Sequence, residues 1–361
     1  MPKLKIADKE TLDYIKNKLL NMPGLSVLEC SELEDVINYV NESVSTLPYG
    51  FAYGSAVILN GEIHILGGNV SESYRTHHYK WNGTEWTSVS TLPYEFLQGS
   101  AVVFNNEIHI LGGNGSLTKH YKWNGSSWTS VSTLPYNFYF GSAVVLNNEI
   151  HILGSGYNNY TKHYKWNGSS WTSVSTLPYD YSYGSAIVLN GEIHILGSNN
   201  SSYHTAHYKW NGSSWTSVST LPYDFIKGSA IVLNGEIHIL GTSINGYRTL
   251  HYKWNGSSWS SVGTLPYEFC YAGAIVLNNE IHILGSGSDN NKYHYKLNKI
   301  YKKVSAYLKQ NQKIGVPYDI SNIDAVTNCT KETNNLLVTE DGLTEFQIRT
   351  QDKEIVMTVK G

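Results

Sequence analysis

The chain has 361 residues, and its 26 Lys and Arg residues against 29 Asp and Glu residues leave a formal net charge of −3. A slightly acidic chain lacks the basic surface that nucleic acids and anionic membranes attract, so we expect neither kind of partner. No apolar run has the length of a membrane span, which predicts no membrane insertion, and the three cysteines, Cys30, Cys270 and Cys329, form no disulfide or metal motif.

The amino-terminal segment, residues 1–41, has a helical pattern. Apolar residues recur at three- and four-residue spacings in two groups, and Ser31 with Glu34 forms a capping box before the second group. The first group is Leu12, Ile15 and Leu19, and the second is Leu33, Val36, Ile37 and Val40. The sequence therefore predicts two short amphipathic helices, which we interpret as a docking segment.

Residues 42–299 consist of near-identical copies of one unit. The leading glycine of the phrase GSAVVLNNEIHILG recurs at steps of 42 to 45 residues, at Gly54, Gly99, Gly141, Gly184, Gly228 and Gly273. Each unit has four short segments rich in Val, Ile, Tyr and Trp, and Asn-Gly or Asn-Asn separates the first two. Four-stranded units that repeat every 40 to 50 residues must stack around an axis to bury their faces, so the sequence predicts a six-bladed β-propeller.

The repeat resembles the kelch family over residues 42–298. Segment 108–113 reads IHILGG, Tyr121 follows it, and Trp128 lies seven residues further on. The Gly-Gly doublet of that family also stands at 67–68, whereas later copies have Gly-Ser or Gly-Thr at 154–155, 197–198, 241–242 and 285–286. The family's usual tyrosine on the second strand is a histidine in every copy. The resemblance implies an all-β kelch-type propeller.

Ring closure is predicted from a missing strand. Five units end in a Trp-bearing fourth strand, and the sixth unit has none after it. Residues 43–49, SVSTLPY, repeat the end of that strand before the first unit, so we expect the amino-terminal segment to complete the last blade. The competing segment, 300–306, has an apolar spacing closer to that of a helix.

The carboxy-terminal segment, residues 300–361, has lost the repeat. It is predicted to contain a helix followed by a small β-rich appendage, because apolar residues alternate around Leu337, Gln347 and Val356.

Twelve of the fourteen histidines occupy two repeated positions, one on the second strand and one on the third. A residue present in every blade serves what all blades share, so we interpret these histidines as structural and expect no metal and no cofactor. The second-strand set is His64, His109, His151, His194, His238 and His282, and the third-strand set is His78, His120, His163, His207, His251 and His294.

Two enzyme families built on propellers fit the residues poorly. Sialidases hold the substrate carboxylate with three arginines, and the repeat region contains only Arg75 and Arg248. Kelch copper oxidases join a Cys to a Tyr, for which Cys270 beside Tyr271 is the only candidate, and they have seven blades. We therefore predict a protein that is not an enzyme and has no catalytic residues.

The copies differ mainly in the connections between the second and third strands and between one blade and the next. These two connections emerge on the same face of an up-and-down blade, which we name the loop face. Its Tyr, Asn and Ser content is typical of adaptable recognition surfaces. The candidate ligand-binding residues are Tyr74, Arg75, Tyr139, Tyr157, Tyr160, Asp180, Tyr183, Tyr203, Asp224, Tyr247 and Arg248.

These observations favour a recognition or structural module without enzymatic activity. The near-identical repeats and small flanks resemble a bacteriophage tail or baseplate protein, which implies a virion location after assembly in the bacterial cytoplasm. Residues 1–41 and 300–361 would contact other virion proteins, in a homo-oligomeric arrangement, while the loop face would bind a bacterial surface glycan or protein. The alternatives are a cytoplasmic kelch adaptor for another protein and, less favoured, a glycan-active enzyme.

Overall fold

The computed structural model describes residues 37–68, 75–156, 158–242, 244, 248–286 and 292–301, together with four short strands nearer the carboxy terminus. The helices predicted within residues 1–36, and the part of the carboxy-terminal helix beyond residue 301, lie outside the described residues. The described part of the chain contains no helix with the length and hydrophobicity needed to span a bilayer.

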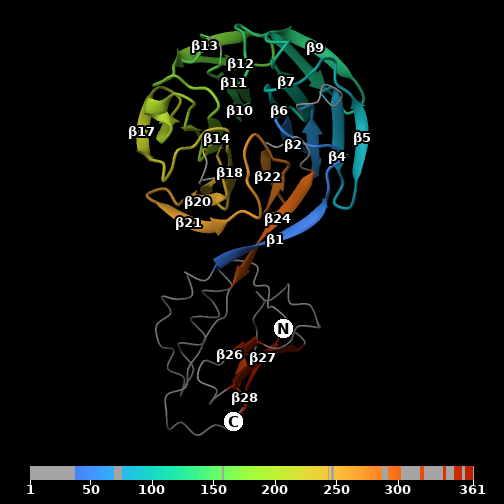
Figure 1. The fold of residues 1–361 in the computed structure, drawn as a ribbon, viewed down its shortest axis with the longest axis vertical. Coiled ribbons are helices and arrows are strands. Elements are labelled where there is room, and N and C mark those ends of the chain that lie inside the picture. The colour runs from blue at the N-terminus through green and yellow to red at the C-terminus, as the bar shows by residue number, and fades with distance from the viewer. Residues whose placement is uncertain are drawn as a thin grey trace. The chain divides into compact units, whose positions relative to one another are not determined.

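The repeat region folds into a six-bladed β-propeller, and each blade is a four-stranded antiparallel sheet (Figure 1). Blade 1 consists of β2 (Ser55–Leu59), β3 (Glu62–Leu66), β4 (His77–Trp81) and β5 (Trp86–Thr91). Blade 2 consists of β6 (Ser100–Phe104), β7 (Glu107–Leu111), β8 (Lys119–Trp123) and β9 (Trp128–Thr133). Blade 3 consists of β10 (Ser142–Leu146), β11 (Glu149–Leu153), β12 (Lys162–Trp166) and β13 (Trp171–Thr176).

Blades 4 to 6 repeat this plan. Blade 4 consists of β14 (Ser185–Leu189), β15 (Glu192–Leu196), β16 (Ala206–Trp210) and β17 (Trp215–Thr220), with a short 3-10 turn at Ser201–Tyr203. Blade 5 consists of β18 (Ser229–Leu233), β19 (Glu236–Leu240), β20 (Leu250–Trp254) and β21 (Trp259–Thr264). Blade 6 consists of β22 (Gly273–Leu277), β23 (Glu280–Leu284), β24 (Tyr293–Tyr301) and β1 (Ile37–Thr46).

The outer strand of blade 6 is β1, which pairs with β24. Ile37 and Val40 were predicted to end a helix, and this prediction is wrong, because both residues lie in β1. A helix cannot pair with the open edge of β24, and this tertiary pairing outweighs the local apolar spacing. Ile300 and Tyr301 likewise extend β24, so the segment predicted to be helical begins as a strand.

The carboxy-terminal segment contains a separate four-stranded sheet with the order β25-β28-β27-β26. Its strands are β25 (Tyr318–Ile320), β26 (Leu336–Val338), β27 (Glu345–Gln351) and β28 (Glu354–Lys360). The β-rich appendage expected here is therefore present. Residues 41–298 form one compact unit of the chain.

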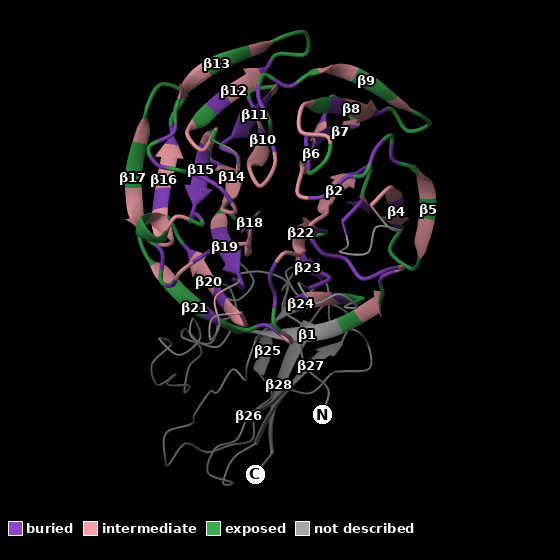
Figure 2. Cartoon of the chain, turned by 45° about the horizontal axis from the view of Figure 1, so that its top comes forward, coloured by how far each residue is buried: buried purple, intermediate pink, exposed green. Residues whose placement is uncertain are grey.

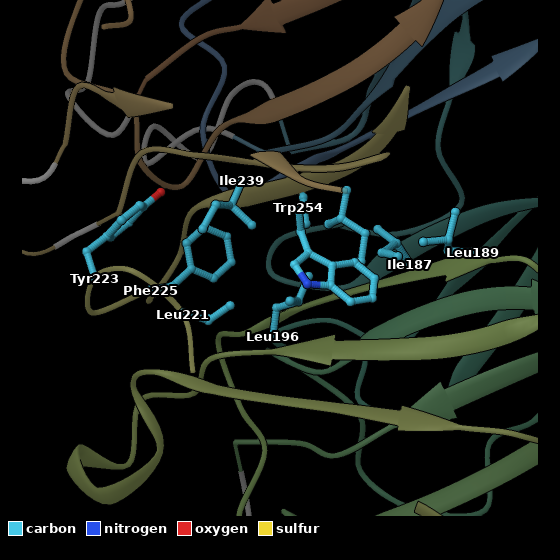
Figure 3. Close-up of a cluster of buried hydrophobic side chains, with 10 residues drawn as sticks. Ile187, Leu189, Leu196, Leu221, Tyr223, Phe225, Ile239 and Trp254 are labelled. Carbon is cyan, nitrogen blue, oxygen red and sulfur yellow. The ribbon is translucent and has the colours of Figure 1, made fainter. Parts of the chain in front are cut away.

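The hydrophobic core lies between neighbouring blades. Figure 3 shows one such cluster, in which Ile187 and Leu189 of blade 4 face Ile239 and Trp254 of blade 5, with Phe225 beside them. Buried residues concentrate in the second strands, and the outer strands are mainly intermediate or exposed (Figure 2). Six aromatic residues that recur once in every copy are fully buried in this core, namely Phe51, Phe96, Phe138, Tyr181, Phe225 and Phe269. Burying each one contributes about 2 kcal/mol.

The first glycine of the Gly-Gly or Gly-Ser pair is retained because nothing larger fits. Gly154 has φ +60°, and an added Cβ would lie 2.1 Å from the carbonyl oxygen of Tyr181. The second position is less constrained. Where Ser155 or Ser198 replaces the second glycine, its hydroxyl donates to a backbone carbonyl, that of Asn137 (2.8 Å) or of Asp180 (2.6 Å).

Candidate functional site

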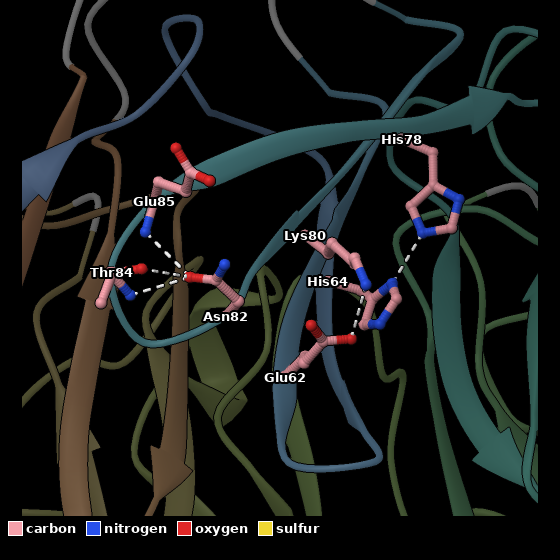
Figure 4. Close-up of polar contacts among 7 residues, drawn as sticks. All are labelled: Glu62, His64, His78, Lys80, Asn82, Thr84 and Glu85. Atoms are coloured by element: carbon pink, nitrogen blue, oxygen red, sulfur yellow. Dashed lines mark hydrogen bonds and ion pairs between the residues drawn. The ribbon is translucent and has the colours of Figure 1, made fainter.

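The repeated histidines form one hydrogen-bonded chain in each blade. In blade 1, His64 Nδ1 lies 2.8 Å from His78 Nε2 (Figure 4), and His78 Nδ1 lies 3.0 Å from Ser90 Oγ. Trp128 of blade 2 then donates from Nε1 to the same Ser90 Oγ at 3.0 Å. Every hydrogen bond of this series is made when the serine hydroxyl donates to His78 Nδ1 and His78 Nε2 donates to His64 Nδ1. Each imidazole then has one nitrogen that accepts a hydrogen bond and carries no proton, so both imidazoles are neutral. These contacts connect neighbouring blades.

Burial keeps these imidazoles uncharged. It lowers the pKa of His64 to about 4 and the pKa of His78 to about 3. The same geometry recurs in blades 2, 3 and 4, where the two imidazoles lie 2.8 to 2.9 Å apart. Among the described residues, no group of three or more His, Cys, Asp or Glu side chains is placed to hold a metal ion. The repeated histidines are used in contacts between blades.

Three charged residues predicted to bind ligand, Arg75, Asp224 and Arg248, each pair with another side chain of the same blade. Arg75 donates to Glu95 at 3.1 Å, and Arg248 donates to Glu268 at 2.8 Å. At the equivalent place in blade 4, His204 Nδ1 lies 3.6 Å from Asp224 Oδ2. Each of these pairs joins two connections of one blade, so these groups are already engaged.

The predicted tyrosines divide into two groups. Tyr203 stacks on Tyr179 with ring centroids 4.9 Å apart, away from the axis, and Asp180 nearby accepts a 3.5 Å bond from Asn200. Tyr139, Tyr160 and Tyr183, by contrast, lie close enough to interact electrostatically. Tyr74, Tyr157 and Tyr247 lie outside the described residues.

A closed ring of backbone hydrogen bonds surrounds the propeller axis where the inner strands begin. Each blade supplies one residue, and its N–H donates to the carbonyl of the equivalent residue in the preceding blade at 2.7 to 2.8 Å. All six residues have φ between 57° and 62°, a left-handed conformation that is uncommon outside glycine and often marks a functional position. We name these residues the axial ring: Tyr53, Gln98, Phe140, Tyr183, Lys227 and Tyr271.

Five neighbouring side chains of the axial ring contact one another in sequence, and we name them the axial arc: Tyr53, Tyr271, Lys227, Tyr183 and Phe140. The rings of Tyr53 and Tyr271 lie 4.3 Å apart, and Phe140 stacks on Tyr183 at 3.7 Å. The ammonium of Lys227 lies 4.6 Å from the ring centroid of Tyr183 and 4.4 Å from that of Tyr271. All five side chains remain partly exposed.

Burial raises the pKa of both Tyr53 and Tyr183, with a smaller contribution from neighbouring tyrosines. Their hydroxyls therefore stay protonated near neutral pH and can both donate and accept hydrogen bonds. The axial arc thus presents flat apolar rings, neutral hydroxyls and one ammonium on rigid backbone. This combination is suited to binding a ligand that has both apolar and polar faces.

Sequence reasoning found Tyr183 and the adjoining Tyr139 and Tyr160, but it missed the other members of the axial ring. One signal was available. The residue before the leading glycine changes from copy to copy beside a nearly constant phrase, and it reads Tyr, Gln, Phe, Tyr and Lys in the first five copies. In the sixth copy the structural equivalent of that glycine is Ala272, one residue before Gly273, which is the first residue of β22.

No protein-family model matches the chain, and no curated protein matches it either. Among solved structures, one described as "Structure of YjhT" is similar with a TM-score of 0.58. The two chains are 14% identical, and the match covers 71% of this chain and 96% of the other. At this identity the likeness concerns the fold alone. The comparison and the strand topology together show that the chain contains a six-bladed β-propeller.

Proposed function

We propose that this protein is a recognition module without enzymatic activity, and that the loop face binds a bacterial surface glycan or protein around the axial ring. One observation carries the proposal. Six symmetry-equivalent positions at the axis carry different side chains, and five of them form a continuous, partly exposed arc. The repeated histidine, serine and tryptophan side chains, by contrast, are hydrogen-bonded to one another.

A glycan is the favoured ligand. The faces of sugar rings present C–H groups that pack on aromatic rings, and their hydroxyls need donors and acceptors at the edge of the same surface. The axial arc supplies both through Phe140, Tyr183 and Tyr53. The left-handed backbone and its closed hydrogen-bonded ring fix these side chains before a ligand arrives, which lowers the entropic cost of binding.

The proposal extends to family and location. The glycine doublets at 67–68 and 112–113, the third-strand tyrosine and the tryptophan of five outer strands support assignment to the kelch type, and the glycine and the tryptophan have structural roles. We place the protein in a virion, as a tail or baseplate component that contacts other virion proteins through residues 1–41 and 300–361. A cytoplasmic adaptor that binds another protein is the alternative.

Two experiments test the proposal. Purified full-length protein is applied to an array of bacterial surface glycans, in parallel with Tyr183→Ala and with Tyr203→Ala as the matched control away from the axis. We expect binding that Tyr183→Ala abolishes and Tyr203→Ala retains, with all three proteins melting as folded propellers. Binding that both variants retain would place the ligand elsewhere, and chemical conversion of a bound glycan would show an enzyme.

The second experiment addresses location. Gold-labelled antibody against residues 50–298 is applied to particles released from the producing bacterium and viewed by electron microscopy. Label at a tail tip or baseplate supports the virion assignment. Label that remains with the soluble cell fraction, with none on particles, would contradict it and favour the cytoplasmic adaptor.

A further inference from the structure

Most basic residues of the propeller are paired with a carboxylate, and Lys227 differs from these in what surrounds its charge. Each blade has a lysine on the third strand that pairs with a glutamate on the second strand, at 2.8 to 3.1 Å. Arg75 and Arg248 are also paired with glutamates. Within the described residues, the contacts of Lys227 are instead with two tyrosines, Tyr183 and Tyr271.

The two tyrosines that contact Lys227 do not neutralise its positive charge. Its ammonium donates to Tyr271 Oη and lies over the rings of Tyr183 and Tyr271. Tyr183 is held protonated by burial, which raises its pKa. Contacts between an ammonium and aromatic rings stabilise the cation but leave its positive charge in place. Of the three N–H groups of the ammonium, one is used by Tyr271, so others remain for a ligand.

The charge also lies where ligands are expected. Lys227 sits in the middle of the axial arc, with Tyr271 and Tyr53 on one side and Tyr183 and Phe140 on the other. The side chain is half-buried, which strengthens a hydrogen bond between its ammonium and an anion relative to the same bond in water. An anionic group bound there would bring the rest of the ligand onto an aromatic ring.

We infer that the axial arc binds a saccharide that carries an anionic group, with a carboxylate or phosphate oxygen accepting from Lys227 Nζ and a sugar ring lying on Phe140, Tyr183 or Tyr53. This inference rests on the proposed function and names the ligand chemistry of the same site. A saccharide fits better than an acidic peptide, because the flat rings flanking the single ammonium match a rigid ring with C–H faces. Carboxylate and phosphate share the required chemistry.

The test measures binding of four probes to the full-length protein by isothermal titration calorimetry. Trigalacturonate is compared with its neutral methyl ester, and mannose 6-phosphate is compared with mannose. We expect the charged member of at least one pair to bind about 10- to 100-fold more tightly, since charge-assisted hydrogen bonds have that value. The pair that shows the preference identifies the anionic group.

Two variants assign the preference to Lys227. Lys227→Met keeps the length of the side chain and removes the charge, so the preference for the charged probe should disappear. Lys162→Met removes an exposed charge at the start of β12, next to a loop-face connection, and should keep the preference. Melting curves confirm that both variants are folded.

The outcomes separate this inference from the proposed function. Equal binding of charged and neutral probes, or an unchanged preference in Lys227→Met, would overturn the inference and leave saccharide recognition standing. Binding of none of the four probes, together with ligands on the glycan array that are all neutral, would also overturn it. An empty glycan array would instead remove the proposed function itself.

Discussion

Mild acid should unfold this propeller because of its buried histidine pairs. In blades 1, 2, 3, 4 and 6, burial lowers the pKa of the second-strand histidine to about 4 and that of the third-strand histidine to about 3, against an ordinary value of 6.5. The unfolded chain therefore binds protons near pH 6 that the folded chain does not bind. The stabilising contribution is fully present above pH 6.5 and is lost as the pH falls toward 4 and then 3.

The magnitude follows from linkage. Each histidine that is neutral when folded and protonated when unfolded removes about 1.4 kcal/mol from the free energy of unfolding per pH unit. The pair of one blade thus removes about 2.7 kcal/mol per pH unit between roughly pH 6 and pH 4.5. Five such blades lose about 14 kcal/mol over one pH unit, which is comparable to the whole stability of a typical domain, 5 to 15 kcal/mol.

The assay is urea unfolding of the full chain followed by tryptophan fluorescence, at pH values from 8 to 4. We expect little change above pH 7 and a loss of the folded state within about one unit below pH 6. The double variant His151→Leu with His163→Leu removes one pair, so the slope of unfolding free energy against pH should fall by about two protons. A folded state that persists until carboxylates titrate below pH 4.5, or an unchanged slope in the double variant, would refute the reasoning.

Three further predictions concern stability, each measured by urea unfolding at pH 7.5. Gly154→Ala should lower the free energy of unfolding by more than ~3 kcal/mol, because the added Cβ would lie 2.1 Å from a carbonyl oxygen. Gly168 also has a positive φ but has open space around it, so Gly168→Ala should lower the free energy of unfolding by only about 1 kcal/mol. Equal losses in the two variants would contradict this reasoning. Ser45→Ala should lower the free energy of unfolding by about 2 kcal/mol, because it removes the hydrogen-bond partner of both His294 and Trp86. Ser43 is exposed, so Ser43→Ala should lower it by less than ~0.5 kcal/mol. Gly273→Ser should raise the free energy of unfolding by about 1 kcal/mol, because the equivalent serines of other blades accept a hydrogen bond from the next blade. The added Cβ would meet its neighbours at no less than 3.4 Å. A lower free energy of unfolding would show that the last junction is packed differently.

The fold could be predicted from the sequence because its signals are local and repeated. Positive-φ turns such as Asn147-Asn148 and the run of four buried residues in EIHIL recur in each unit, and each copy confirms the others. The failure at Ile37 and Val40 has the opposite cause. Their strand depends on a partner, β24, that lies more than 250 residues away in the sequence, so the local helical spacing was misleading.

The candidate site could be predicted only in part, for the same reason. The tyrosine-rich loops led to Tyr183, a member of the axial arc, but Tyr53 and Tyr271 belong to blades at opposite ends of the sequence and meet only when the ring closes. Arg75 and Arg248 have the chemistry of ligand contacts, but each is paired with a glutamate that the sequence alone does not place beside it. Lys227 drew no attention in the sequence, because its importance comes from the absence of a carboxylate among its described contacts.

Departures from symmetry at the last junction show how the repeated residues depend on one another. The tryptophan of each outer strand donates to the serine of the preceding blade, as Trp86 does to Ser45. By its spacing from Ser45, Asn41 occupies the tryptophan position of blade 6, and the serine position of blade 5 is Gly263. At this one junction the donor position and the acceptor position of the same hydrogen bond both differ from the other blades. The tryptophan and the serine are therefore present together or absent together. Paired loss of this kind is expected of residues whose role is the contact between blades. It therefore supports the structural role of the hydrogen-bonded chain of histidine, serine and tryptophan. The residues of the axial ring, by contrast, vary from blade to blade independently of this chain.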